Sequence, residues 1–521
     1  MRRREFLGCS TAAAAGLLFL RTARPALAGF VVPPEADLRQ LTADALDAAK
    51  SAGASYADIR INHYRNQFVS TREDQVQSAS DSESFGFGVR VLANGAWGFS
   101  SSTMVTHDEV VRAAREAVTI AKANAVLQRK PVQLAPTPAY TDTWQTPITI
   151  NPFDVPIQEK ADLLLSVNRE ALKANGARYC ESSLFIANEN KTFASSEGSY
   201  IKQDIYRVWP SFEVTAVSAD GSDFQSRAGY CMPVGRGYEY CKEYPLLDDA
   251  RQAGEDAVAK LSAPTVVPGK RDLILMPSHM WLVIHESVAH ATELDRALGF
   301  EANFAGTSFV TTDNLGKLKY GSDIVTIVGD RTETNGLSTV GYDDEGVKAS
   351  RFDIIRNGTF VDYQTIREQA AWIGGKESHG CAYADSYEHM PMQRMPNVSL
   401  LPSEKPTKPE DLIAGVDDGI LIKGNGSWSI DQQRRNLQFG GQVFHQIKGG
   451  KITGMLRDVA YQAMTVDFWN SCDGICSREY YELGGSYWCG KAQPEQAAPV
   501  SHGCAPSRFR NINFINTGRK V

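Results

Sequence analysis

The segment 262–269 divides the chain into two parts of different character. Its sequence, Ser-Ala-Pro-Thr-Val-Val-Pro-Gly, has the composition of a linker between folded units. Before it, predicted helices and strands alternate, whereas beyond about residue 305 strand and turn patterns dominate, as at Asn357-Gly358. Because 521 residues are too many for one compact domain, we expect several. The pattern predicts an α+β protein with an α/β N-terminal region and a larger, strand-rich C-terminal domain.

Hydrophobic periodicity subdivides the first part. The alternating residues 85–91 and the turn Asn94-Gly95 predict a β-hairpin. A helix follows, and the capping-box sequence Thr106-x-x-Glu109 marks its start. A proline-rich stretch from 131 then leads into a second helix and further strands. The expected units are an N-terminal α+β domain, a central α/β region and the strand-rich domain, at 33–130, 131–262 and 270–521.

The first 28 residues have the pattern of an export signal. Arg3-Arg4-x-Phe6-Leu7 resembles a twin-arginine motif, an apolar run follows at 11–20, and Ala26-Leu27-Ala28 suits a signal peptidase. The run is shorter than the ~20 residues of a membrane-spanning helix, although an uncleaved anchor is the alternative. We therefore expect a cleaved twin-arginine signal peptide at 1–28, a periplasmic protein and no membrane contact after cleavage.

Charge and cysteine content limit the partners. The signal carries five Arg and one Glu, so its removal shifts the formal net charge from −7 to −11. Nucleic-acid binding needs a basic footprint, and we expect none here. Eight cysteines remain after cleavage, and an oxidising periplasm would permit disulfides whose connectivity the sequence does not reveal.

The string His285-Glu286-Ser-Val-Ala-His290 carries the strongest chemical signal. Histidine nitrogens are common zinc ligands, and Glu286 could accept a proton from a water molecule at the metal. Zinc peptidase helices usually carry His-Glu-x-x-His, with the histidines four residues apart, whereas here they are five apart. At ~3.6 residues per turn this spacing would splay the rings by about 140°. A shared metal therefore predicts a local π-type widening of the helix.

Two histidines do not complete a catalytic zinc site, which usually has three protein ligands. Residue spacing alone does not choose the third, and the two carboxylates nearest the motif could instead orient a histidine N–H. Without a third ligand, the histidines could also be ordinary core or cap residues. The candidates are Glu293, Asp295, His379, His389, His445, His502 and the cysteines.

Several blocks in order resemble the TldD/PmbA family of metallopeptidases, specifically its TldD-type members. His285 to His290 followed by Glu293-Leu294-Asp295 matches the family's active-site helix. The similarity extends over about residues 40–515, including 88–99 in the first domain and Cys489-Gly490-Lys491 near the C-terminus. Two further blocks lie in the last domain, at 342–346 and 386–397.

The resemblance implies a zinc-dependent peptidase acting on unfolded or small peptides. Carried over residue by residue, it makes His285, His290 and Cys489 the metal ligands and Glu286 the general base. For Cys489, a disulfide with Cys476 or Cys504 is the alternative. Further candidates for contacts with substrate, or for purely structural hydrogen bonds, are Tyr387, His389 and Arg394.

The resemblance also implies an extended peptide substrate paired with a strand edge, and either a homodimer or a heterodimer with a PmbA-type subunit. Two other functions remain open. The chain could be a non-catalytic partner subunit, although it keeps all four metal-site residues, or a secreted redox or binding protein that uses its cysteines.

Overall fold

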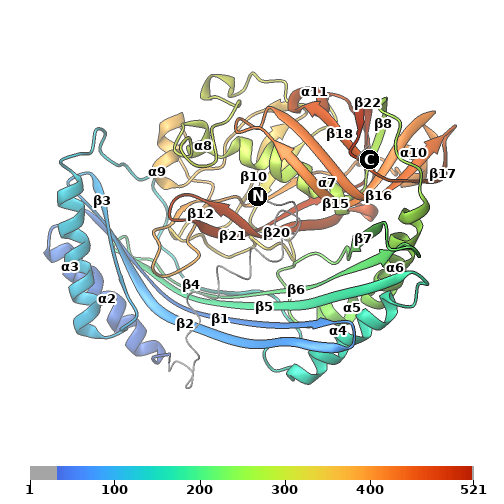
Figure 1. The fold of residues 1–521 in the computed structure, drawn as a ribbon. Coiled ribbons are helices and arrows are strands. Elements are labelled where there is room, and N and C mark those ends of the chain that lie inside the picture. Colours follow the sequence, from blue (N-terminus) through green and yellow to red (C-terminus); the bar gives the residue numbers. More distant parts are fainter. Residues whose placement is uncertain (1–31, 519–521) are drawn as a thin grey trace.

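The computed structural model describes residues 32–518 and consists of a long curved sheet with flanking helices beneath a strand-rich half (Figure 1). The fold is mixed α and β with strands predominating, as predicted. The expected signal at 1–28 lies outside the described residues. In the part of the chain that the structure describes, no helix is both long and apolar enough to cross a membrane.

The two predicted N-terminal units contribute strands to one seven-stranded sheet. Its order is β3-β2-β1-β5-β6-β4, with β7 paired to β6, so the β1–β5 pair joins the units. Asn94 and Gly95 adopt positive φ between β2 and β3, which confirms the predicted hairpin. The strands are β1 (Tyr56–Arg72), β2 (Gln75–Ala93), β3 (Ala96–Ser102), β4 (Thr141–Gln145), β5 (Ala177–Ser195), β6 (Tyr200–Val217) and β7 (Phe224–Ala228).

Helices cover the two ends of this sheet (Figure 1). At one end lie α2 (Glu35–Ser51) and α3 (His107–Asn124). The other end carries α4 (Ile157–Ala171), α5 (Glu239–Glu243) and α6 (Leu246–Ser262).

The start of α3 differs in detail from its prediction. The helix begins after Thr106 as expected, but the Thr106 side chain makes no capping hydrogen bond. Glu109, expected to complete the capping box, instead accepts a hydrogen bond from Arg112 at 2.7 Å. The competing ion pair within the first turns of the helix explains why the box does not form.

The strand-rich half is built on a closed ring of five strands. Going round the ring, β15 pairs with β8, β8 with β22, β22 with β18, β18 with β16, and β16 again with β15. Two further strands extend it, β17 on β16 and β19 on β22. The bounds are β8 (Gly269–Leu275), β15 (Asp418–Ile430), β16 (Asn436–Lys448), β17 (Lys451–Leu456), β18 (Val459–Met464), β19 (Cys472–Ile475) and β22 (Ser507–Asn516).

Smaller elements surround the ring. A four-stranded sheet has the order β11-β10-β9-β14, and two short hairpins pair β12 with β13 and β20 with β21. These strands are β9 (Ile327–Asp330), β10 (Arg351–Arg356), β11 (Thr359–Phe360), β12 (Ala382–Tyr383), β13 (Met392–Gln393), β14 (Asn397–Leu400), β20 (Glu482–Lys491) and β21 (Gln496–Cys504). The short helices are α8 (Leu294–Ala297), α9 (Arg367–Ala370), α10 (Pro409–Ala414) and α11 (Thr465–Asn470).

One helix, α7 (Pro277–Ile284), runs through the core of this half. It follows β8 directly, and Met280, Val283 and Ile284 are fully buried in the main hydrophobic cluster. The cluster also contains side chains of the strand ring and of β21. The residues that follow Ile284 are therefore surrounded by packed, buried side chains of this cluster.

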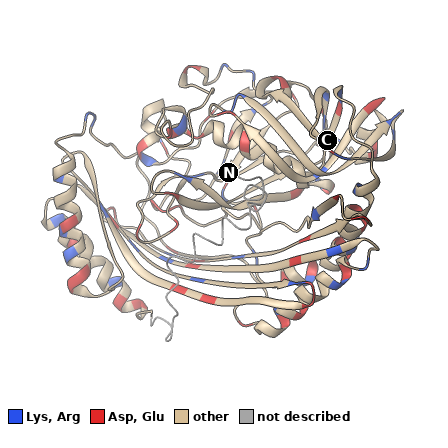
Figure 2. Ribbon diagram, in the orientation of Figure 1, with Lys and Arg blue, Asp and Glu red and all other residues tan. Residues whose placement is uncertain are grey.

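Buried charges connect the long sheet to the strand-rich half. Figure 2 shows charged residues along the strands of the sheet as well as on its outer helices. Arg90 on β2 binds Asp58 on β1 at 2.7 Å and Glu345 of the second half at 2.9 Å, with all three side chains buried. Lys191 on β5 likewise pairs with Asp344 at 3.2 Å. The sheet thus holds the 343–345 turn by ion pairs inside the protein.

Replacing Arg90 by Met should destabilise the protein strongly, because it leaves the Asp58 and Glu345 carboxylates buried without a counter-charge. We expect a loss of about 3–5 kcal/mol, measured as a lower thermal midpoint by calorimetry. The matched control is Arg112→Met, since Arg112 pairs with two glutamates but its side chain is 49% exposed. That change should cost less than about 1 kcal/mol. Equal losses in the two variants would contradict the role given to the buried ion pairs.

Candidate metal centre

The predicted motif lies at the end of α7, where the helical hydrogen-bonding pattern changes. After the α-helical residues, His285–Ala289 form a π turn and His290–Thr292 form a 3-10 turn. The His290 N–H donates to the His285 carbonyl, which is the i to i+5 bond of a π turn. The two imidazole centroids are 4.7 Å apart. The widening predicted from the spacing is therefore confirmed.

Side chains from other segments bind the carbonyl groups of this irregular turn. The Tyr320 hydroxyl donates to the Ser287 carbonyl, and Gln364 Nε2 donates to the Ala289 carbonyl at 2.6 Å. The Ser287 hydroxyl accepts a hydrogen bond from Trp469 Nε1 at 3.0 Å. Because an unpaired buried carbonyl costs about 1–3 kcal/mol, these contacts stabilise the π turn against a regular helix.

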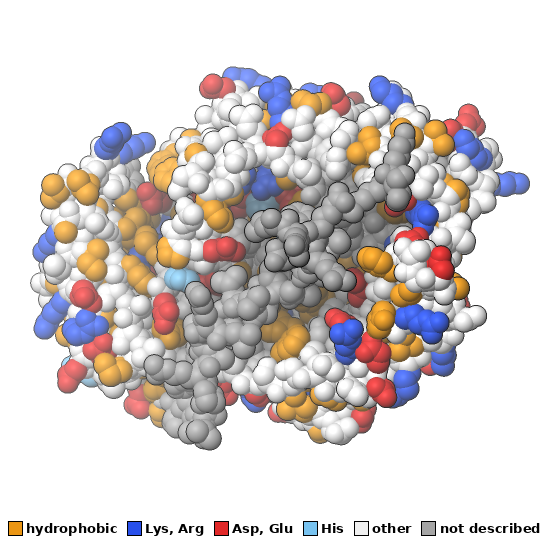
Figure 3. Space-filling view, viewed as in Figure 1, with side chains coloured by type: hydrophobic (Ala, Val, Ile, Leu, Met, Phe, Trp, Pro, Cys, Tyr) orange, Lys and Arg blue, Asp and Glu red, His pale blue; other side chains and the backbone are white. Residues whose placement is uncertain are grey.

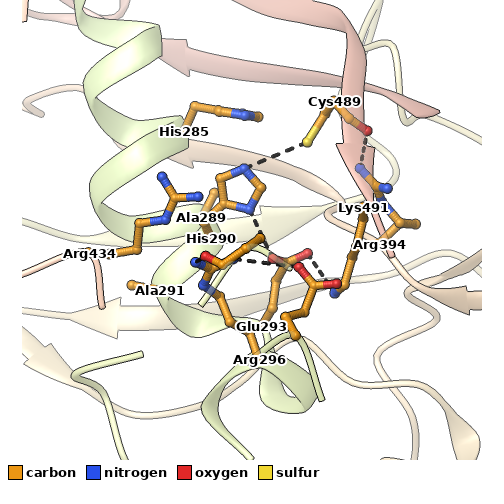
Figure 4. Close-up of polar contacts among 12 residues, drawn as sticks. His285, Ala289, His290, Ala291, Glu293, Arg296, Arg394, Arg434, Cys489 and Lys491 are labelled. Carbon is orange, nitrogen blue, oxygen red and sulfur yellow. Dashed lines mark hydrogen bonds and ion pairs between the residues drawn. The ribbon is translucent and has the colours of Figure 1, made fainter. Parts of the chain in front are cut away.

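Cys489 supplies a third donor from a distant part of the chain. It lies on β20, and its Sγ is 3.8 Å from His290 Nε2 (Figure 4). One donor atom from each of His285, His290 and Cys489 lies within 4.8 Å of the others, and all three residues are buried. Zinc bonds of about 2.0–2.1 Å to nitrogen and 2.3 Å to sulfur would hold tetrahedral donors roughly 3.3–3.6 Å apart. The donor set therefore fits one zinc ion if the three donor atoms move closer together.

The surroundings of Cys489 favour its metal-binding form. Burial raises the pKa of the thiol, but Arg394, His285 and His290 outweigh burial and hold this pKa well below its ordinary value. Arg394 is 1% exposed and donates a hydrogen bond to the Cys489 carbonyl (Figure 4). It donates another to the Gln496 carbonyl at 2.9 Å. The structure thus places Arg394 against the backbone of β20 and β21, where it stabilises the thiolate.

Hydrogen bonds also determine which ring nitrogen of each histidine is free. His290 Nδ1 is 3.0 Å from the Glu293 carboxylate, which can only accept, so the proton lies on Nδ1 and Nε2 is free. His502 Nδ1 donates to the Val398 carbonyl at 2.9 Å. Burial holds the pKa of His502 well below its usual value, so its Nε2 carries a lone pair. That lone pair accepts from His285 Nδ1 at 2.8 Å, which leaves His285 Nε2 free for a metal.

Lys491 connects the thiolate strand to the His290 hydrogen bond. Cys489 and Lys491 are two residues apart on β20, so their side chains lie on the same face of the strand. Lys491 Nζ binds Glu293 at 3.1 Å, Asp295 at 2.8 Å and Gln393 at 2.7 Å. Burial raises the pKa of Glu293, but Lys491 and His290 outweigh it and hold that pKa below its usual value. Glu293 therefore orients His290, whereas Asp295 binds Lys491, and both carboxylates lie outside the three-donor cluster.

Glu286 lies beside the donor cluster with its carboxylate bound to Arg434. The Arg434 Nη1 forms an ion pair with Glu286 Oε2, and Glu286 is 7% exposed. Burial raises the pKa of Glu286, yet Arg434, His290 and His285 together lower it below its ordinary value. Glu286 is thus ionised, as a general base must be. Neither Arg434 nor the role of His502 was found in the sequence, because no local pattern marks either residue.

The other residues singled out as substrate contacts lie in the 385–394 segment. Tyr387 is 5% exposed and packs on β2, where a Cβ on Gly88 would lie 2.4 Å from the Tyr387 carbonyl oxygen. The His389 side chain is 32% exposed, and its Nδ1 is 2.6 Å from Asp385. Their contact with substrate remains a proposal, for which His389 has the more accessible side chain.

The remaining candidate ligands are placed elsewhere. His379 pairs with Asp362 at 2.8 Å, and neither His379 nor His445 belongs to the three-donor cluster. The eight cysteines in the described residues are all free and buried, Cys476 and Cys504 included. Cys489 therefore forms no disulfide in this structure, and its thiol belongs to the group of potential metal ligands.

The surface is hollowed between the lobe of α2 and α3 and the strand-rich half (Figure 3). A separate cavity of about 640 Å³ lies between the segments 230–244, 328–335 and 478–483. None of the three candidate ligands lines this cavity. The metal centre is thus a small, buried site distinct from that cavity.

Three family models match the chain in sequence order. They are the PmbA/TldA metallopeptidase domain 1 at 57–121, the central domain at 150–261 and the C-terminal domain at 268–516. Together they cover most of the chain and include all four residues of the metal centre.

Individual proteins show the same similarity. A metalloprotease of Methanocaldococcus jannaschii is 29% identical over 452 residues, which are 86% of this chain and 94% of that protein. A zinc metalloprotease TldD homolog of Saccharolobus solfataricus is 24% identical over 439 residues, 82% of this chain and 90% of the other. The crystal structure of TldE from Thermococcus kodakarensis superposes with a TM-score of 0.69 at 15% identity, covering 92% of this chain and 99% of that one. This last likeness concerns the fold.

Replacing His502 by Phe should weaken zinc binding about 10- to 100-fold, because His285 loses the acceptor that keeps its proton on Nδ1. His502→Gln retains an acceptor and should recover much of the affinity. Zinc affinity is measured by competition with a chromophoric chelator, and the absorption spectrum of the cobalt-substituted protein reports the ligand geometry. His445→Gln, outside the cluster, is the control. Wild-type affinity in His502→Phe would show that the His285–His502 contact does not orient the ligand.

Proposed function

Because this chain belongs to the PmbA/TldA metallopeptidase family, we propose that it is a zinc-dependent peptidase that hydrolyses unfolded or small peptides. The observation that carries the proposal is the buried His285, His290 and Cys489 cluster with the Glu286 carboxylate beside it. A cluster with one position left for a fourth ligand is typical of catalytic rather than structural zinc. The name of the Saccharolobus relative, which specifies zinc, adds support.

The metal and the protein would divide the chemistry between them. A bound zinc ion would supply Lewis acidity, polarising the scissile carbonyl and acidifying water. Glu286 accepts a proton from the attacking water molecule and passes it to the leaving nitrogen, while the water oxygen bonds to the carbonyl carbon and the C–N bond breaks. Lys491, Glu293 and His502 hold the two imidazoles in the orientation that this reaction needs.

We further propose an extended peptide substrate, bound by pairing with a strand edge near β20, and contacts from Tyr387 or His389. Assembly as a homodimer, or as a heterodimer with a PmbA-type subunit, and a periplasmic location after twin-arginine export belong to the same proposal. The fold likeness to TldE is compatible with a paired subunit.

The alternative of a non-catalytic partner subunit is disfavoured by one observation. All four residues that the chemistry requires are present, and they lie together in the fold. A cysteine-based redox function is less well supported, since each described cysteine is buried and unpaired. Metal-free protein after expression with a working export route would favour the partner-subunit alternative.

Glu286→Gln should reduce kcat about 10²- to 10⁴-fold, because the amide cannot take the proton from water. Cleavage of β-casein, an unfolded chain, is followed by mass spectrometry, and zinc content is measured on the same samples. The zinc content should stay at the wild-type level, since Glu286 is not among the donors. Glu404→Gln, at an exposed glutamate, is the control. Undiminished cleavage by Glu286→Gln would remove this residue from its proposed role.

A further inference from the structure

Arg434 has more hydrogen-bonding capacity than the structure uses. Its guanidinium carries five N–H groups, and Glu286 is its one side-chain acceptor among the described residues. The Nε atom is fully covered and has no hydrogen-bond partner there. The side chain is 12% exposed, so it is largely withdrawn from water. A buried donor without an acceptor is unfavourable, so the guanidinium has N–H groups that could bind a further acceptor.

The backbone at Arg434 is held in a conformation that an arginine rarely adopts. Its φ is +66°, in the left-handed region where glycine is favoured. Asp431 holds the loop by accepting hydrogen bonds from the backbone N–H groups of Gln433, Arg435 and Asn436. The Arg434 carbonyl itself accepts from Thr465 Oγ1 at 2.6 Å. Strained backbone fixed by its surroundings is characteristic of functional sites.

The guanidinium on this strained backbone lies at the proposed reaction centre. Arg434 lies beside the imidazole of His290 (Figure 4). Its Nη1 donates a hydrogen bond to Glu286 Oε2. A group that served only to neutralise Glu286 would not require a rigid loop, a strained φ and spare donors. Those features suit a ligand that carries negative charge during the reaction.

We propose that Arg434 is a catalytic residue, whose guanidinium binds the carbonyl oxygen of the scissile peptide bond. This inference rests on the proposed peptidase function. As the water oxygen adds to the carbonyl carbon, the C=O π electrons move onto the carbonyl oxygen, and the N–H groups of Arg434 stabilise that charge. When the C–N bond breaks, the electrons return to re-form C=O, and Glu286 delivers its proton to the amine. One water molecule is consumed, and Arg434 keeps its own protons throughout.

The test compares Arg434→Gly and Arg434→Lys with the wild-type protein. Glycine suits the positive φ, so the loop should keep its conformation, but Glu286 loses a buried counter-charge and the thermal midpoint should fall. Assayed below that midpoint, kcat on a β-casein-derived decapeptide should fall about 100- to 1,000-fold. KM and zinc content should remain within about threefold of wild type. Lysine keeps the charge but not the planar fork, and should restore only part of the rate. Added guanidinium ion at millimolar concentration should raise the rate of Arg434→Gly at least tenfold.

Two further measurements separate this role from simpler ones. A phosphinic analogue of the decapeptide resembles the tetrahedral state, so calorimetry should show its affinity falling with kcat in the Arg434 variants. If Arg434 only kept Glu286 charged, the lost rate would return at higher pH. If it bound a substrate carboxylate, the loss would appear in KM and vanish with an amidated peptide. Either result would overturn the proposal.

The control variant is Arg435→Lys, at the exposed neighbour in the same loop, which should retain wild-type kcat. Equal activity of Arg434→Gly and wild type would overturn this inference while leaving the peptidase function intact. A zinc-loaded wild-type protein that cleaves no peptide would overturn the function and the inference together.

Discussion

One backbone hydrogen bond, from the His290 N–H to the His285 carbonyl, determines the geometry of the centre. In a regular α-helix these residues would point about 140° apart and could not share a metal ion. The π turn brings their rings within 4.7 Å, at the cost of normal i to i+4 bonding in a fully buried segment. The packing around the turn can therefore be understood as compensation for that single irregularity. Tyr320 and Gln364 donate hydrogen bonds to two of its carbonyls, those of Ser287 and Ala289.

The orientation of the two histidine rings depends on hydrogen bonds from outside the helix. Glu293 and His502 provide those bonds, and Lys491 in turn fixes Glu293. Because Lys491 and Cys489 share one face of β20, the strand that contributes the thiolate also positions an imidazole. A displacement of β20 would disturb two ligands at once.

The sequence predicted those parts of the centre that depend on local spacing. The five-residue interval between His285 and His290 implies a π turn from helical periodicity alone, and the structure contains one. Cys489 could be identified only through the resemblance to a known family, since about two hundred residues separate it from the helix. Arg434 and His502 act through tertiary contacts and have no sequence pattern. The sheet shared by 33–130 and 131–262 was not foreseen either, because strand pairing such as β1 with β5 is a long-range property.

The long sheet contributes to the centre although none of its residues is a ligand. Arg207 on β6 donates to the Leu337 carbonyl at 2.8 Å, and Ser338, the next residue, donates to the carbonyl of Pro499 on β21 at the same distance. β21 pairs with β20, including Ala498 opposite Cys489. A continuous series of buried polar contacts therefore runs from the sheet to the thiolate strand. Since buried polar groups tolerate little displacement before they lose a partner, the N-terminal half helps to hold Cys489 in register with α7. The C-terminal half therefore supplies the three ligands, and contacts from both halves hold these ligands in position.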